Sequence, residues 1–167
     1  DYLIQIGLTP NRVDAASHIG VARDLVAYLR SRGERIEVQW PDVSAFAPDN
    51  RDLPVKIRVE NTEAAPRYAG VTVTGCKIGP SPEWMQNCLR AAGIHPKNNL
   101  VDITNFVLFE LGQPLHAFDA AKIEGREVVV RTCADGTPFV TLDGVERKLT
   151  SQDLMICSAE RPMCIAG

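Results

Sequence analysis

The chain has 167 residues, of which 45% are hydrophobic and 23% charged, and its formal net charge at pH 7 is -3. This length and apolar content suffice for one hydrophobic core, or for one core with a small satellite, and they exclude a disordered protein. The slightly negative net charge excludes a protein that binds a nucleic-acid backbone across its entire protein surface. The apolar runs are shorter than the roughly 20 residues of a membrane span, and no basic region precedes the first apolar residues as it would in a signal peptide. We therefore expect a cytoplasmic protein that contacts neither a membrane nor DNA.

The five cysteines are Cys76, Cys88, Cys133, Cys157 and Cys164. Their number is odd and they contain no Cys-x-x-Cys pair, so no zinc site is predicted. Their mostly apolar neighbours favour small buried side chains in a reducing compartment. The chain opens directly on a strand pattern and stops within another, so we expect a piece of a longer protein.

In chain order, residues 2–7 alternate as a short strand, and Ser17 caps a helix with apolar residues at helical spacing. Gly33 is predicted to end this helix. Residues 1–34 therefore read as a strand and a helix, too small to fold alone. Residues 35–54 are rich in proline and aspartate without any period, which predicts a linker.

A second domain is predicted over residues 55–167. Residues 55–59 and 67–76 read as strands. A helix is then predicted to begin with Ser81 as its cap and Pro82 at the first helical position, where the missing N–H costs nothing.

The next helix is predicted over residues 99–111, ended by Gly112. Almost every position is apolar, and a helix that is apolar all round is normally buried. Thr104 and Asn105 nevertheless lie in its middle. Burying such a hydroxyl or amide costs about 1–3 kcal/mol unless it finds a partner, so both groups need backbone, water or a ligand.

The last third of the chain reads as β structure. Residues 127–131 form a predicted strand, residues 139–149 a hairpin turning at Asp143-Gly144, and residues 154–157 and 163–166 two further strands. Helices and strands are mixed without regular alternation. This pattern predicts an α+β fold with mixed or antiparallel sheets and a few packed helices.

The candidate polar cluster comprises Thr104, Asn105, His116, Asp119 and Gly167. Pro114 forces the chain to turn soon after the helix ends, so His116 could line one pocket with Thr104 and Asn105. A structural interpretation stands beside this one. In it Thr104 bonds back to the carbonyl of Leu100, Asn105 bonds a neighbouring loop and His116 is a packing residue.

Residues 98–119 closely resemble a signature of the beta subunit of bacterial phenylalanyl-tRNA synthetase. Further matching motifs, in the family's order and spacing, are Thr9-Pro10-Asn11-Arg12, Ser17-His18-Ile19-Gly20, Pro66-Arg67-Tyr68-Ala69-Gly70, Gly79-Pro80-Ser81-Pro82-Glu83-Trp84, Thr141-Leu142-Asp143-Gly144 and Ile165-Ala166-Gly167. The resemblance implies that residues 1–34 are a remnant of the first module and residues 35–54 a linker. It also implies that residues 55–167 are most of the editing module, which consists of the third and fourth modules of that subunit. This editing module is truncated at its C-terminal end.

In that family these modules hydrolyse tyrosine wrongly attached to the phenylalanine tRNA. A phenylalanine pocket rejects an analogue with one added hydroxyl only modestly, so a second site is used. By resemblance, Asn105 and His116 are the catalytic residues that orient the ester and the attacking water. Thr104 and Gly167 belong to the substrate pocket. The family's acidic residue for the tyrosine hydroxyl falls beyond Gly167.

The resemblance also implies a parent enzyme, partners and cofactors. The parent is a phenylalanine-tRNA ligase with two alpha and two beta subunits, and this fragment is at most an aminoacyl-ester hydrolase. Its partners are the alpha subunit and the 3′ end of tRNA(Phe). ATP and magnesium belong to the aminoacylation site of the alpha subunit, so neither a cofactor nor a metal is expected here. The alternatives are a non-catalytic tRNA- or subunit-binding module, and a structural piece docking through a large apolar patch.

Overall fold

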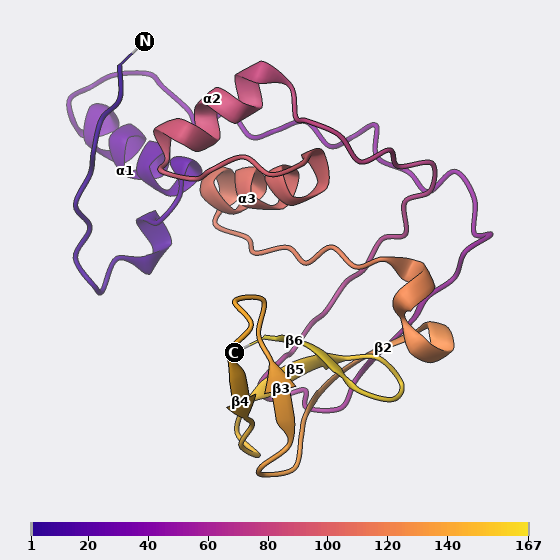
Figure 1. Cartoon of the computed structure of the whole chain (residues 1–167). Coiled ribbons are helices and arrows are strands. Elements are labelled where there is room, and N and C mark those ends of the chain that lie inside the picture. The colour runs from indigo at the N-terminus through magenta and orange to yellow at the C-terminus, as the bar shows by residue number, and fades with distance from the viewer. Residues whose placement is uncertain (1, 167) are drawn as a thin grey trace. The chain divides into compact units, whose positions relative to one another are not determined.

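The computed structural model describes residues 2–166. Within them the chain forms three α-helices, six β-strands and three short 3-10 helices (Figure 1). It divides into two compact units: the first contains the residues up to 47 together with 76–117, and the second contains residues 48–75 and those from 118 onward. The three α-helices lie in the first unit and the strands in the second, so the predicted α+β class is confirmed. The module boundaries at residues 34 and 54 remain a prediction.

Helix α1, His18–Ser31, begins at the predicted cap: the Ser17 hydroxyl oxygen accepts a hydrogen bond from the backbone N–H of Gly20, at 3.0 Å. It ends just before Gly33, whose positive φ of 91° is a left-handed conformation that glycine adopts without strain. Both ends of this helix are therefore confirmed.

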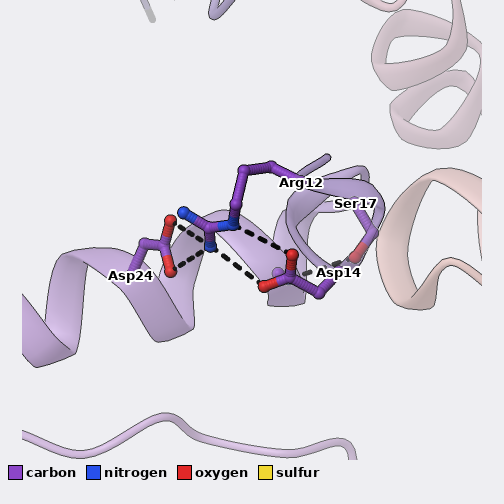
Figure 2. A network of polar contacts seen from close by, with 5 residues as sticks. Arg12, Asp14, Ser17 and Asp24 are labelled. Carbon is purple, nitrogen blue, oxygen red and sulfur yellow. Dashed lines mark hydrogen bonds and ion pairs between the residues drawn. The ribbon is translucent and has the colours of Figure 1, made fainter. Parts of the chain in front are cut away.

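A 3-10 helix, η1 (Val13–Ala15), precedes α1 and is held to it by Arg12. The Arg12 guanidinium donates to Asp14 from Nε, at 2.9 Å, and to Asp24 from Nη2, at 2.7 Å. Figure 2 shows the guanidinium between these two carboxylates, which come from η1 and α1. The hydrogen bond from Arg12 holds the pKa of Asp14 below its ordinary value. These groups are exposed, so the ion pairs orient the turn more than they stabilise the fold.

Helices α2 (Glu83–Ala91) and α3 (Asn99–Leu111) form where helices were predicted. For α3, the Asn98 side chain accepts from the N–H groups of Leu100 and Val101, and Gly112 ends the helix with a left-handed φ of 76°. The predicted start of α2 is wrong by one residue. Pro82 occupies the cap position, where its ring offers no hydrogen-bond acceptor, and the Ser81 hydroxyl donates to Asp102.

The prediction that α3 is buried all round is wrong. Asp102 is the one α3 residue that is fully buried, whereas Ile103 and Phe109 are 44% and 41% exposed. An apolar sequence favours burial of the helix, but burial requires other elements to pack against it. Within the first unit, α3 contacts α1 and α2 and stacks the Phe106 ring edge-on against Trp84, with centroids 5.4 Å apart.

Two predicted strands do not form. Residues 2–7 and 67–76 have no strand assignment, and Leu3 and Val73 are exposed. A strand exists only when its backbone N–H and C=O groups pair with a neighbour. Neither segment pairs with a strand in the described part of the chain.

The second unit contains a four-stranded sheet in the order β1-β2-β5-β6, of which β2, β5 and β6 are labelled in Figure 1. Its strands are β1 (Lys56–Val59), β2 (Glu127–Thr132), β5 (Leu154–Cys157) and β6 (Pro162–Ile165). β1 pairs with β2 in parallel, and β2, β5 and β6 pair antiparallel. The hairpin predicted over residues 139–149 forms as β3 (Pro138–Val140) and β4 (Glu146–Lys148). Its turn contains Gly144, which has a positive φ of 79°.

The core of the second unit lies on both faces of this sheet. One apolar cluster consists of Val129, Leu149, Met155 and Cys157, with Cys133 and Phe139 packed against it. The other consists of Ile123, Val128 and Ile156, with Val55, Ile57, Tyr68, Phe118, Met163 and Cys164 packed against it. Since neighbouring residues of a strand face opposite sides, cover on both faces explains why every residue of β5 is buried.

The prediction of buried cysteines is correct only in part. All five cysteines are thiols outside any disulfide; Cys157 is buried, but Cys76 and Cys88 are exposed. Burial raises the pKa of the Cys164 thiol above its ordinary value. Among the described residues, no helix has the length and apolarity needed to cross a membrane.

Candidate functional site

Asp102 fixes the helix that carries the candidate site. It is 1% exposed, and its carboxylate accepts hydrogen bonds from the Ser81 hydroxyl at 2.5 Å and from the backbone N–H of Lys97 at 2.8 Å. Hydrogen bonds to a buried carboxylate are stronger than neutral ones. Asp102 therefore ties the first turn of α3 to the start of α2 and to the loop between them.

Sequence reasoning missed this role of Asp102. A signal was present: Asp102 is an acidic residue in an otherwise apolar turn, and Ser81 is a hydroxyl next to a proline. Each has a local explanation, as a first-turn acid or as a cap. Only the fold brings the two side chains together across 21 positions of the sequence.

Thr104 and Asn105 are adjacent, half-buried residues near the middle of α3. The Thr104 hydroxyl donates to the carbonyl oxygen of Val101, at 2.7 Å. The back-bonded alternative is thus correct for Thr104, although the acceptor is one residue later than Leu100. Its oxygen can still accept a hydrogen bond, and the Asn105 amide offers both donors and an acceptor.

His116 lies in the segment that leaves α3, where the chain has no helix or strand. Gly112 turns the chain out of the helix, and His116 is exposed four residues later. Thr104, Asn105 and His116 all belong to the first unit. An exposed imidazole can reach a bound ligand and form a hydrogen bond with it.

The remaining two members of the predicted cluster differ from these three. Asp119 belongs to the second unit, where its side chain caps the 3-10 helix η2 (Ala120–Lys122) by accepting from the N–H of Ala121, at 3.0 Å. Gly167 lies outside the described residues. In the part of the chain that the structure describes, no group of three or more His, Cys, Asp and Glu side chains is placed to hold a metal ion.

The fold and the candidate site define an α+β domain in which a helix presents half-buried polar groups and is followed by an exposed histidine. Residues 64–167 match the family described as the B3/4 domain, and the chain belongs to this family.

Three relatives of high sequence identity to this chain are the same subunit in different bacteria. Over 167 residues the chain is 59% identical to the phenylalanine–tRNA ligase beta subunit of Bacteroides fragilis and 58% identical to that of Bacteroides thetaiotaomicron. It is 55% identical over 168 residues to the same subunit of Porphyromonas gingivalis. Each alignment covers 100% of this chain and 20% of the relative, so the chain spans about a fifth of the length of these proteins.

Proposed function

We propose that this chain is a segment of a phenylalanine-tRNA ligase beta subunit and carries most of the site that hydrolyses tyrosyl-tRNA(Phe). The observation that carries the proposal is the 59% identity to such a subunit in an alignment that covers the whole chain. The match of residues 64–167 to the B3/4 domain supports the same assignment.

In this proposal the polar groups of α3 serve the ester end of the substrate. Asn105 orients the ester carbonyl or the attacking water, and His116 binds on the exposed side of the same pocket. Thr104 accepts a hydrogen bond within the pocket, because its own proton is used by the Val101 carbonyl. Gly167 leaves room for the tyrosine side chain or the terminal adenosine.

The proposal extends to partners and place of action. The substrate is the aminoacylated 3′ end of tRNA(Phe), delivered in a cytoplasmic enzyme of two alpha and two beta subunits. Aminoacylation, with ATP and magnesium, takes place in the alpha subunit. The need for hydrolysis follows from specificity, since a hydrophobic pocket rejects an added hydroxyl only about 100-fold.

The test is deacylation of tyrosyl-tRNA(Phe) by the complete enzyme that carries this chain. Wild-type enzyme should clear the mischarged tRNA much faster than buffer does, and His116→Ala should slow clearance by about 100- to 1000-fold, the range for groups that act on the reacting ester. His95→Ala, which removes an exposed histidine in the loop before α3, is the matched control. Clearance no faster than in buffer would refute the assignment.

A second function is favoured by one observation on the first unit. Large apolar side chains are exposed there, among them Tyr2, Leu3, Ile4, Tyr28, Trp40, Val43, Phe46 and Trp84. Exposed apolar surface of this extent marks protein contacts. The chain could therefore act as a non-catalytic tRNA- or subunit-binding module. A complete enzyme that assembles and charges tRNA normally but leaves tyrosyl-tRNA(Phe) intact would support this alternative.

A further inference from the structure

The second unit contains a pair of neighbouring thiols that the proposed hydrolytic site does not use. Cys157 on β5 is 0% exposed and belongs to the apolar cluster on one face of the sheet. Cys133, which directly follows β2, is partly exposed and packs against the same cluster. The two thiols lie within hydrogen-bonding reach of each other. The pair therefore consists of one sulfur that solvent reaches and one that it does not.

The other cysteines are placed differently. Cys164 packs against the apolar cluster on the opposite face of the sheet, because neighbouring residues of a strand face opposite sides. Cys76 and Cys88 belong to the other compact unit. Among the described residues of the second unit, Cys157 is thus the one thiol on the same face as Cys133.

Arg131, at the end of β2, places a cation beside the buried thiol. Burial raises the pKa of the Cys157 thiol, and a hydrogen bond with Arg131 opposes this increase. The Nε of Arg131 is buried and has no hydrogen-bond partner among residues 2–166. A neighbouring cation favours the thiolate, which is the nucleophilic form of cysteine. Negative charge that develops on the Cys157 sulfur is therefore stabilised by this guanidinium.

We propose that Cys133 and Cys157 form a modification site for hydrogen peroxide, in which Cys133 is oxidised first and Cys157, assisted by Arg131, converts it to a disulfide. A partly exposed thiol with a second thiol next to it is the arrangement typical of reversible cysteine oxidation. The order follows from access, since peroxide reaches Cys133 from solvent and Cys157 is covered by the apolar cluster. This site is separate from the residues proposed to hydrolyse the tRNA ester.

The chemistry consists of two steps. The Cys133 thiolate attacks one oxygen of hydrogen peroxide, so that an S–O bond forms and the O–O bond breaks. The departing hydroxide takes up the proton that the thiol released and leaves as water. The Cys157 thiolate then attacks the sulfur of this sulfenic acid, the S–S bond forms, the S–O bond breaks, and the second hydroxide takes up the proton from Cys157. The thiol pair is thus oxidised by two electrons while one peroxide becomes two waters, and a reducing thiol reverses the modification.

The test is mass spectrometry of the complete enzyme that carries this chain, after treatment with hydrogen peroxide and alkylation of the remaining thiols. Cleavage after glutamate places Cys133, Cys157 and Cys164 on separate peptides. A cross-linked pair of the Cys133 and Cys157 peptides should appear, and reduction should separate it. The cross-link should form at least about tenfold faster than sulfinic acid at Cys133, because the neighbouring thiol intercepts the sulfenic acid. Sulfinic acid at Cys133 without a cross-link, a cross-link from Cys133 to Cys164, or no oxidation of Cys133 would overturn the proposal.

Variants distinguish the two sulfurs. Cys157→Ser should leave Cys133 as a sulfenic acid, which a dimedone probe traps, and later as sulfinic acid. Cys133→Ser should keep Cys157 reduced, because the Cys157 thiol is 0% exposed. Cys164→Ser is the matched control and should form the cross-link as wild type does. Equal oxidation of Cys157 in wild type and in Cys133→Ser would contradict the assigned order.

The contribution of Arg131 has its own measurement. Arg131→Met should slow formation of the cross-link at least about threefold, because the Cys157 thiolate loses its neighbouring cation. Arg131→Lys keeps a positive charge and should slow it less. Arg147→Met, which removes an exposed cation on β4, is the control. An unchanged rate in an Arg131→Met variant that is folded by circular dichroism would contradict the assistance assigned to the guanidinium. None of these outcomes depends on hydrolysis of tyrosyl-tRNA.

Discussion

At the scale of single residues, the positions of the polar groups on α3 depend on residues that do no chemistry. Asp102 is buried in the first turn of α3 and accepts hydrogen bonds from Ser81 and Lys97. In α1, Gly20 allows the close approach of the 3-10 helix η1. A change at either residue should therefore act through stability. Both expectations can be measured by denaturant unfolding of the 167-residue chain.

Asp102→Ala should lower the free energy of unfolding by about 2–4 kcal/mol, because it removes two hydrogen bonds to a charged acceptor and leaves the Ser81 hydroxyl and the Lys97 N–H unpaired. Asp102→Asn keeps one acceptor oxygen and should cost about 1–2 kcal/mol. Equal stability of wild type and Asp102→Ala in urea would show that this buried contact does not hold α3 in place.

Gly20→Ala should also destabilise, although alanine favours a helix by about 1 kcal/mol. The added Cβ would lie 2.7 Å from Cα of Ala15 and closer still to the Asp14 carbonyl oxygen, so backbone must move. Overpacking of this kind costs about 1–3 kcal/mol. Gly79→Ala, where nothing lies within 4 Å of the new Cβ, is the control and should be neutral. A gain in stability on Gly20→Ala would contradict the close approach.

Residue-scale features could be predicted where their cause is local. Ser17 as a cap and Gly33 and Gly112 as helix ends are correct because each depends on a few neighbouring backbone groups. The Ser81–Asp102 hydrogen bond could not be predicted, because it joins side chains 21 positions apart. The candidate site shares this limit: Thr104 and Asn105 could be placed on a helix, but the surroundings of His116 depend on tertiary structure.

At the scale of elements, the predicted helices and the strands with a pairing neighbour formed, whereas the unpaired strand segments did not. Helix α3 and strand β5 are both strongly apolar, but only β5 is buried throughout, because packed side chains cover both faces of its sheet. Residues 2–7 and 67–76 have strand patterns and remain without a ladder. The hydrophobic pattern of a segment shows which of its faces favours burial. Whether that face is buried depends on the packing of the rest of the fold.

The parallel β1–β2 pair leads to a pH prediction. Glu127 on β2 forms ion pairs with Lys56 and Arg58 on β1, both at 3.2 Å, and hydrogen bonds from these two cations hold the pKa of Glu127 below its ordinary value of 4.5. A lowered pKa in the folded state stabilises the fold above the ordinary pKa, and this contribution is lost as pH falls through the folded value. Wild-type stability should therefore fall below about pH 4.5 more steeply than that of Glu127→Gln. Parallel acid limbs in the two unfolding curves would contradict this linkage.

At the scale of the whole molecule, the two compact units differ in how they are stabilised. The second unit has apolar clusters on both faces of its sheet, with Val129 and Met155 1% and 0% exposed. In the first unit few side chains are fully buried, and many large apolar ones are exposed. This contrast is consistent with a segment that spans about a fifth of its relatives' length.

Hydrogen exchange should reveal this difference in the 167-residue chain. The slowest backbone amides should lie in β2 and β5, since opening the central strands exposes both apolar clusters. Amides of α1 and α3 should exchange faster, because less apolar surface covers them. Slower exchange in α3 than in β5, measured by mass spectrometry at neutral pH, would reverse the assigned order of stability.

In the function we propose, α3 and the segment after it form one hydrolytic site, and a double-mutant cycle tests this arrangement most directly. Deacylation of tyrosyl-tRNA(Phe) is measured in the complete enzyme for wild type, Asn105→Ala, His116→Ala and the double variant. If both residues act on one ester, the double variant should be scarcely slower than the slower single variant, because residues that act as a unit are strongly non-additive. Fully additive losses, or a rate unchanged by either single substitution, would contradict a shared site.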